Sequence, residues 1–169
     1  TIGNERYCSL TILGVCIGEW RHYCPTVHSL AWEPEQLQQE RDAVNALQAG
    51  GATRADFGLQ HAVTQLNSGR PGAQKLTIFY SDGSPTSSDG FETTVADAAI
   101  RAAAQLKAGT SQVISIGAMS GANPDGTDNA NKFMNYVSSN YPDAQSMSEP
   151  GARGEGTYYY AVSASTNLQ

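Results

Sequence analysis

The chain has 169 residues, a length that allows one ordinary domain with a hydrophobic core. Hydrophobic residues make up 40% of the sequence, which is typical of a folded globular protein and excludes a disordered tail. The net charge is −6 and only 10 residues are lysine or arginine, so the sequence provides no basic face for tight nucleic-acid binding. No run is apolar for long enough to form a transmembrane helix, and no signal peptide is visible. Because the chain begins with Thr1 and not with methionine, we expect it to be a mature chain or one excised from a longer protein.

The N-terminal part of the sequence predicts an antiparallel hairpin. Residues 10–17 are apolar and β-branched, which favours a strand, and a second extended run covers residues 25–32 after a short gap. Cys8, Cys16 and Cys24 do not have the spacing of a metal-binding motif. On one strand Cys8 and Cys16 would lie about 26 Å apart, too far for a disulfide. Cys16 and Cys24 could meet across the hairpin, and three free thiols are the alternative.

Two helices are predicted after the hairpin. Residues 33–48 carry apolar side chains at helical spacing, have a proline in the first turn and end at two glycines. A Gly-rich loop then leads to a second helix that begins at about Asp56, which we expect to be its N-cap. The polar residues 67–69 end this second helix.

The rest of the chain alternates short apolar strands with helices. Residues 76–80, LTIFY, are apolar without alternation, which is typical of a strand buried on both faces of a parallel sheet. An Ala-rich helix over residues 92–109, a second buried strand within 113–119, a helix over 129–142 that ends at a proline, and a last strand within 156–162 follow. This order predicts an α/β fold with an open parallel sheet and ligand binding at the carboxyl ends of the strands.

Two polar loops are the candidates for a binding site at that edge. Asp82 directly follows the strand at 76–80, and Gly83 frees the turn after it, so the carboxylate can face a ligand or a hard cation. Thr53 follows two glycines, and a threonine hydroxyl can ligate Mg²⁺ beside water and carboxylates. The alternatives are a plain Asp-Gly turn for Asp82 and a simple helix start for Thr53 and Asp56.

These two loops resemble those of a known family. LTIFYSDGSPT is similar to the strand and loop that carry the second aspartate of von Willebrand factor A domains, and GGATRADFGLQHA resembles their loop with the metal-binding threonine. The order of the elements is also similar, and the tail resembles the A domains of bacterial surface proteins and pilus-tip adhesins. The resemblance implies a doubly wound, mostly parallel, Rossmann-like sheet flanked by helices, with one antiparallel edge hairpin. It implies a single domain over residues 1–169 that is incomplete at its N-terminus.

The resemblance also implies a metal-ion-dependent adhesion site, of which this sequence contains a part. In the family an Asp-x-Ser-x-Ser loop, a threonine and a further aspartate hold the metal, and Thr53 and Asp82 match the last two. No D-x-S-x-S motif occurs before the hairpin, and the central strand that leads to it is missing as well. Losing the four or five buried side chains of such a strand costs on the order of 10 kcal/mol. We therefore expect Mg²⁺, or Mn²⁺ or Ca²⁺, only if another segment or chain supplies the missing loop, because Mg²⁺ requires octahedral oxygen ligation.

The function implied by the resemblance is a metal-ion-dependent protein-binding or adhesion module of a surface or secreted protein. Such a module is extracellular, is part of a larger protein, and binds a protein ligand through an acidic side chain of that ligand. The alternative is a structural scaffold subunit of a pilus or cell wall whose metal site is non-functional.

No enzymatic constellation is recognisable. Ser120 in GAMSG does not lie in a G-x-S-x-G elbow and has no acid–histidine pair at a suitable spacing. His22, His28 and His61 are too scattered for a zinc signature. The glycines of residues 151–156 do not lie between a strand and a helix in the order that a phosphate loop requires. The sequence therefore predicts no catalytic residue and no enzyme.

Overall fold

The computed structural model describes residues 5–8, 11–12, 15–16, 20–23, 38, 41–42, 45, 52–69, 72–81, 84–88, 90–108 and 111–162. The chain forms two compact units, Thr1–Gly51 and Ala52–Gln169, each of which is described by itself.

The first unit contains two small antiparallel ladders. Its strands are β1 (Glu5–Cys8), β2 (Thr11–Ile12), β3 (Val15–Cys16) and β4 (Trp20–Tyr23), with β1 paired to β4 and β2 paired to β3. The predicted single strand over residues 10–17 is wrong, because its two ends pair with each other. Gly14 lies between them, outside the described residues, and a glycine weakens the interior of a strand. The predicted run over residues 25–32 also lies outside the described residues.

Four described residues fall in the predicted helix over residues 33–48. Gln38, Arg41, Asp42 and Asn45 are helical and exposed. The amide Nε2 of Gln38 donates a hydrogen bond of 2.8 Å to Oδ1 of Asp42, one helical turn later. Their spacing places them on one polar side of a helix, so the predicted helix is confirmed at these positions.

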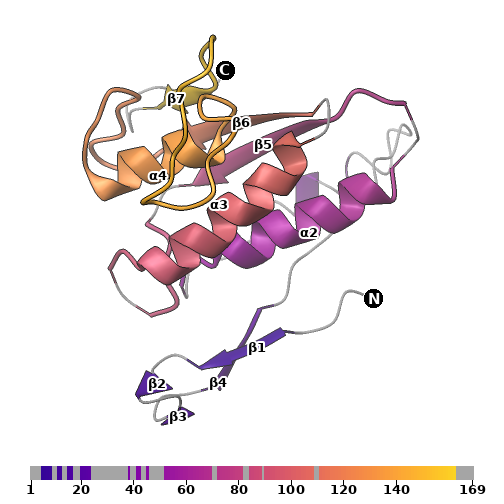
Figure 1. Ribbon diagram of the computed structural model, residues 1–169. Coiled ribbons are helices and arrows are strands. Elements are labelled where there is room, and N and C mark those ends of the chain that lie inside the picture. The colour runs from indigo at the N-terminus through magenta and orange to yellow at the C-terminus, as the bar shows by residue number, and fades with distance from the viewer. Residues whose placement is uncertain are drawn as a thin grey trace. The chain divides into compact units, whose positions relative to one another are not determined.

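The second unit is a three-stranded parallel sheet with helices packed along it (Figure 1). In chain order its elements are α2 (Ala55–Asn67), β5 (Leu76–Ser81), α3 (Thr93–Lys107), β6 (Gln112–Gly117), α4 (Asn129–Val137) and β7 (Tyr159–Ala161). The strand order is β5-β6-β7, with both pairs parallel. This confirms the predicted α/β alternation and the parallel sheet. None of the described helices is both long and apolar enough to cross a membrane.

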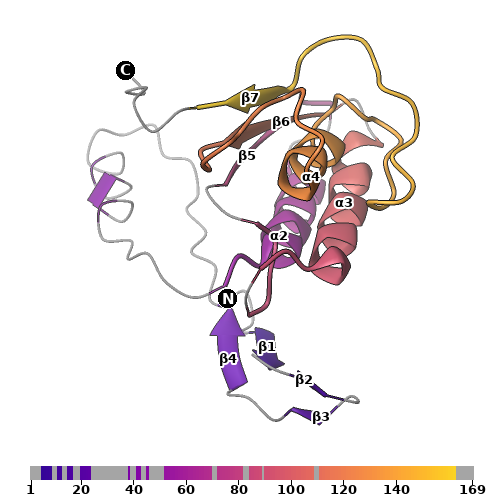
Figure 2. The same cartoon turned by 90° about the vertical axis from the view of Figure 1, so that its left-hand side faces the viewer.

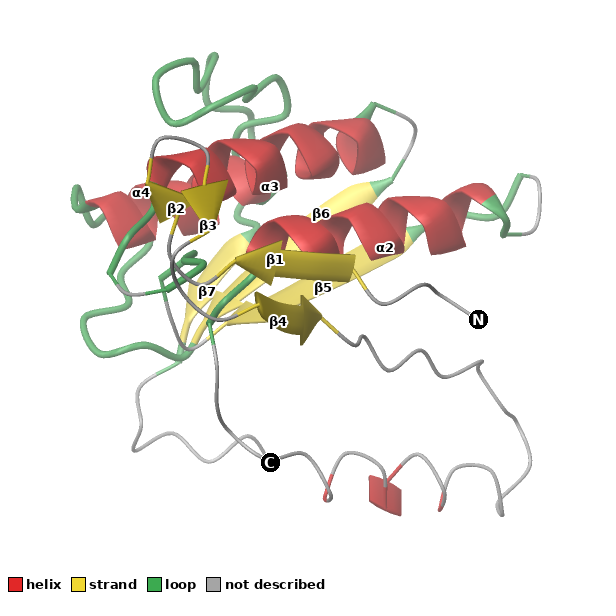
Figure 3. Ribbon diagram, turned by 90° about the horizontal axis from the view of Figure 1, so that it is seen from below, coloured by secondary structure: helices red, strands yellow, loops and turns green. Residues whose placement is uncertain are grey.

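The core lies between the sheet and the helices, which cover the same face of it (Figure 2). Helices α2 and α3 lie side by side along the strands (Figure 3). Small side chains of α3 make this close packing possible, because Ala96, Ala99 and Ala103 are fully buried. From the sheet side, the ring of Phe79 meets that of Phe133 edge to face, with 6.0 Å between centroids.

None of the described helices covers the other face of the sheet. Leu76, Ile78 and Tyr80 of β5 are 52%, 60% and 55% exposed, and Tyr160 of β7 is 48% exposed. The prediction that residues 76–80 are buried on both faces is therefore wrong for the part of the chain that the structure describes. The unbroken apolar run gives β5 two apolar faces, and the described elements bury one of them.

Helix α4 ends earlier than the sequence suggests. The predicted end was Pro142, but the helix stops at Val137 and the next residue, Ser138, is extended. A contact from another helix stabilises the chain beyond this end. The buried ammonium of Lys107 in α3 donates to the carbonyl oxygens of Tyr136 and Tyr141, both at 2.8 Å, and so supplies a donor to carbonyl groups at the helix end.

Candidate functional site

The threonine loop and the loop after β5 lie side by side at the carboxyl end of that strand. The backbone amide of Thr86 donates a hydrogen bond of 3.0 Å to the carbonyl oxygen of Thr53. The same oxygen accepts a hydrogen bond of 2.9 Å from the amide of Ala55 at the start of α2. Thr86 comes four residues after Asp82 in the sequence. The structure thus brings the two loops together, while Asp82 lies outside the described residues and the position of its carboxylate stays a prediction.

The hydroxyl of Thr53 is available as a ligand. Thr53 is partly exposed, and its side chain forms no hydrogen bond with the described residues. A hydroxyl oxygen of this kind suits Mg²⁺, which combines few protein oxygens with water molecules. The role of Thr53 as a metal ligand stays a prediction, as does its simpler role of leading into α2.

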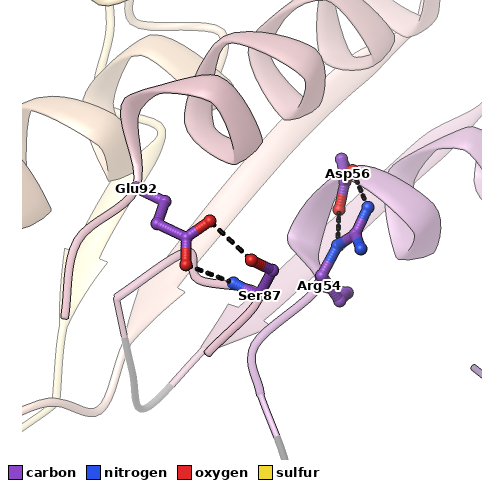
Figure 4. A network of polar contacts seen from close by, with 4 residues as sticks. All are labelled: Arg54, Asp56, Ser87 and Glu92. Carbon is purple, nitrogen blue, oxygen red and sulfur yellow. Dashed lines mark hydrogen bonds and ion pairs between the residues drawn. The ribbon is translucent and has the colours of Figure 1, made fainter. Parts of the chain in front are cut away.

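The loop after β5 is held in shape by Glu92, which directly precedes α3 (Figure 4). Its carboxylate accepts hydrogen bonds from the amide and hydroxyl of Ser87 at 3.0 and 2.6 Å, and from the hydroxyl of Thr86 at 3.1 Å. The amide and hydroxyl of Ser88 donate to the same carboxylate, both at 3.1 Å. Burial raises the pKa of the Glu92 carboxyl, but the hydrogen bonds from Ser87, Thr86 and Ser88 outweigh burial and leave the pKa below its usual value.

A largely buried ion pair lies at the start of α2. Arg54 donates from Nε and Nη2 to the two carboxylate oxygens of Asp56, at 2.9 and 2.6 Å (Figure 4). Its guanidinium carbon lies 3.6 Å from the centroid of the Phe57 ring. The expected N-cap role of Asp56 is wrong, since the helix begins at Ala55, its N-cap is Arg54, and the carboxylate of Asp56 binds the guanidinium instead of the backbone. The feature of the sequence that could have indicated this ion pair is the arginine two residues before Asp56 at the start of the helix.

A third loop, between β6 and α4, borders the same edge. The amide of Ala118 donates a hydrogen bond of 2.8 Å to the carbonyl oxygen of Ser81, the last residue of β5. Asn131 fixes this loop from the first turn of α4, because its Oδ1 accepts from the amide of Asn123 at 2.8 Å and from the hydroxyl of Tyr159 at 2.5 Å. Its Nδ2 donates to the carbonyl oxygen of Gly121 at 3.0 Å. The sequence analysis did not single out Asn131, since nothing local distinguishes it from the other asparagines nearby.

The N-terminus of α4 is closed by Asp128, its N-cap. The carboxylate accepts hydrogen bonds from the amide and from Nδ2 of Asn131, at 3.0 and 2.6 Å. These bonds, above all the one from the Asn131 side chain, hold the pKa of the Asp128 carboxyl below its usual value. Because this carboxylate serves as a helix cap, it is not free to bind a cation.

The described residues do not by themselves complete a metal site. They contain no group of three or more histidine, cysteine, aspartate or glutamate side chains that could hold a metal ion. Two nearby carboxylates have other partners, since Asp56 binds Arg54 and Glu92 binds the loop at residues 86–88. A cation at this edge would therefore need the carboxylate of Asp82 and further ligands from outside the described residues.

The other candidates from the sequence form no catalytic or metal-binding cluster among the residues that the structure describes. His61 lies in α2 and His22 in β4, each in a different unit of the chain, and His28 lies outside the described residues. Ser120 lies in an exposed turn after β6. Residues 151–156, which contain the glycines considered for phosphate binding, form a loop that is followed in the chain by strand β7 and not by a helix.

The comparisons with known proteins agree with this architecture. Residues 26–168 match the von Willebrand factor type A domain. Searches of the curated proteins and of the solved structures found no match. The matched region contains Thr53, the loop after β5 and every described helix and strand of the second unit. Since this match covers most of the chain and the structure has the expected parallel α/β sheet, the protein belongs to the von Willebrand factor type A domain family.

Proposed function

We propose that this domain is a non-enzymatic protein-binding module whose partner docks on a divalent cation at the carboxyl edge of the parallel sheet. Domains of this family generally mediate protein–protein interactions and occur in larger proteins. The observation that carries the proposal is the hydrogen bond of 3.0 Å from the amide of Thr86 to the carbonyl oxygen of Thr53. It holds the threonine loop against the loop that begins with Asp82.

In this proposal Thr53 and Asp82 hold Mg²⁺ or Mn²⁺, with Ca²⁺ as a further candidate. A hydroxyl and a carboxylate are oxygen ligands that these hard cations prefer, but two of them leave an octahedron incomplete. A D-x-S-x-S loop on another segment or chain would supply further oxygens. An acidic side chain of the protein partner would take a remaining position, which makes the cation the link between the two proteins.

The surroundings of the proposed site support it through rigidity and charge. Glu92 and Asn131 fix the loop after β5 and the loop between β6 and α4 by hydrogen bonds. Binding of a partner would therefore cost little further conformational entropy in these loops. Arg54 would repel a cation bound near Thr53, but its charge is matched by the carboxylate of Asp56 at 2.6 Å.

The test is calorimetric titration of Mn²⁺ into a form of the protein to which a segment with D-x-S-x-S has been added. We expect Thr53→Ala and Asp82→Ala each to weaken Mn²⁺ binding at least tenfold, because each removes a direct ligand. The matched control is Thr94→Ala, a substitution at an exposed threonine of α3, which should bind Mn²⁺ as the wild type does. If both site variants bind Mn²⁺ and the partner as tightly as the wild type, the site assignment is wrong.

A structural scaffold of a pilus or cell wall is the second candidate. It is favoured by the pairing of two carboxylates near Thr53, since Asp56 binds Arg54 and Glu92 binds the loop at residues 86–88. Partner binding that persists unchanged in excess EDTA would support the scaffold over the metal-dependent module. For location we propose the cell surface or the extracellular space; the family occurs in extracellular and surface proteins and also in intracellular ones.

A further inference from the structure

A pocket of about 240 Å³ lies against α4, at a place that the proposed metal site does not use. It is lined by Pro124, Asp125, Gly126, Thr127, Lys132, Asn135, Tyr136, Tyr141 and Arg153. None of these residues belongs to the threonine loop or to the loop after β5. The pocket is smaller than the 300–1,000 Å³ or so of sites for drug-sized ligands. Its volume is suited to one amino-acid side chain or one small oxyanion.

The walls of this pocket are fixed by hydrogen bonds. The side-chain amide of Asn135 donates to the carbonyl oxygens of Pro124 at 2.8 Å and Asn131 at 3.2 Å, which ties the loop before α4 to the helix. Asn140 donates from Nδ2 to Oδ1 of Asn135 at 2.8 Å, and its carbonyl oxygen accepts from the amide of Gly154, also at 2.8 Å. Arg153 therefore stands on a segment that is anchored to the helix end, and the pocket exists before any ligand arrives.

The lining is cationic on an acidic protein. Lys132 and Arg153 are two of the 10 basic residues of the chain, whose net charge is −6. Neither forms an ion pair with any residue that the structure describes. Asp125 is the one acidic residue of the lining, so the pocket carries a net positive charge. Two cationic side chains from separate segments therefore line the same pocket.

The pocket also has an aromatic wall. The rings of Tyr136 and Tyr141 meet edge to face, with 4.9 Å between centroids and 77° between planes. Burial, with a smaller contribution from Tyr141, raises the pKa of the Tyr136 hydroxyl. The aromatic carbon atoms can contact an aliphatic stem while the cations bind the charged group at its end.

We infer that this pocket binds the carboxylate of an acidic side chain, with glutamate as the best fit. Lys132 and Arg153 pair with the carboxylate oxygens, and the rings of Tyr136 and Tyr141 pack on the methylene groups. The inference rests on the proposed function as a protein-binding module and adds a second contact for the same protein partner. This contact needs no metal ion, and it lies on residues that the metal site does not share.

The experiment uses the full chain in excess EDTA and the probe N-acetyl-glutamate N-methylamide, followed by NMR. We expect saturable shifts at the backbone amides of residues 125–127, 132 and 153, and none with the matched glutamine compound. Lys132→Gln and Arg153→Gln should each weaken binding about two- to fivefold, as expected for a solvent-exposed ion pair. Arg101→Gln, at an exposed arginine of α3, is the control and should leave binding unchanged.

Three results with the capped amino acids would each overturn the inference. They are an absence of saturable shifts, equal binding of the glutamine compound, and unchanged affinity in both pocket variants. Free succinate that binds more tightly than the capped glutamate would also overturn it, because the natural occupant would then be a small diacid and not a side chain. EDTA keeps the proposed metal site out of the measurement, so failure here and failure of the Mn²⁺ titration are separate outcomes.

Discussion

The buried lysine of α3 provides a test of the structure that does not depend on any ligand. Lys107 is 9% exposed, and its ammonium donates to the carbonyl oxygens of Tyr136 and Tyr141 at 2.8 Å and of Ser138 at 3.3 Å. Lys107→Met keeps the apolar stem and removes the donor. Each buried carbonyl left without a donor costs about 1–3 kcal/mol, while the variant no longer buries a charge. We expect a net loss of about 2 kcal/mol in the free energy of unfolding at pH 7.

The pH dependence of that loss has a defined sign. Burial lowers the pKa of Lys107 to about 8 from 10.5, against an opposing pull from the carboxylate of Asp143. Between these two values the unfolded chain holds the proton and the folded protein has begun to lose it. The contribution of Lys107 to stability therefore rises with pH through this window. From pH 7 to pH 9.5 the linkage amounts to about 2 kcal/mol, so the difference between wild type and Lys107→Met should double over that range.

Urea unfolding of both proteins at half-unit pH steps measures this difference. Taking the difference between the two proteins cancels the titration of cysteines and tyrosines that both contain. Gln105→Met, at an exposed position of α3, serves as the control and should differ from the wild type by an amount that does not change with pH, because neither side chain titrates. A difference for Lys107→Met that stays flat or shrinks between pH 7 and pH 9.5 would contradict the burial of a charged ammonium at this place.

Three further predictions concern the sheet and the loops. Phe79→Ala should lower the free energy of unfolding by about 3 kcal/mol, whereas Ile78→Ala, at a position 60% exposed, should cost about 1 kcal/mol or less in the same urea experiment; equal costs would mean that the open face of the sheet is covered. Glu92→Gln should destabilise the protein by about 1 kcal/mol at pH 7. Because the pKa of Glu92 is lowered in the folded state, this difference should disappear as the pH falls below 4.5, which thermal unfolding at pH 7 and pH 3 would show. Asn131→Ala should lower the free energy of unfolding by about 2–4 kcal/mol through its lost hydrogen bonds. Asn129→Ala, at an exposed position two residues earlier in α4, should lower it by less than about 1 kcal/mol in the same urea experiment.

The regular elements of the second unit could be predicted because their signals are local. The unbroken apolar run of β5, the Ala-rich stretch of α3 and the polar residues after α2 each express the conformation of their own segment. Their order then fixes a parallel sheet, since parallel neighbours need a crossover between them. The hairpin of the first unit was misjudged because residues 10–17 have strand propensity throughout, and propensity does not show where a strand turns.

The details that could not be predicted from the sequence depend on contacts with particular side chains, several of them far away in the chain. Helix α4 ends at Val137, where Lys107, about 30 residues earlier in the chain, binds carbonyl oxygens of the helix end. Asp56 fails as an N-cap because Arg54 binds its carboxylate, and the cap rule takes no account of that competition. Asn131 joins three segments through one amide group, and no spacing rule predicts such a junction. The proximity of Thr53 to the loop after β5 was predictable, because both segments border the carboxyl end of one strand.

The proposed metal site and the sheet of the second unit could be completed by the same element. Among the described strands β5 pairs with β6 alone, so its other edge has no partner among those strands. We propose that a strand pairing with that edge of β5 would bring a D-x-S-x-S loop to the proposed site at Thr53 and Asp82. Pairing there would satisfy the ladder of β5 and bring the missing cation ligands in the same step. A peptide with an apolar strand followed by D-x-S-x-S should therefore raise both the unfolding free energy and the Mn²⁺ affinity of the chain, while a scrambled peptide should raise neither. A gain in one without the other would show that the two deficits are unrelated.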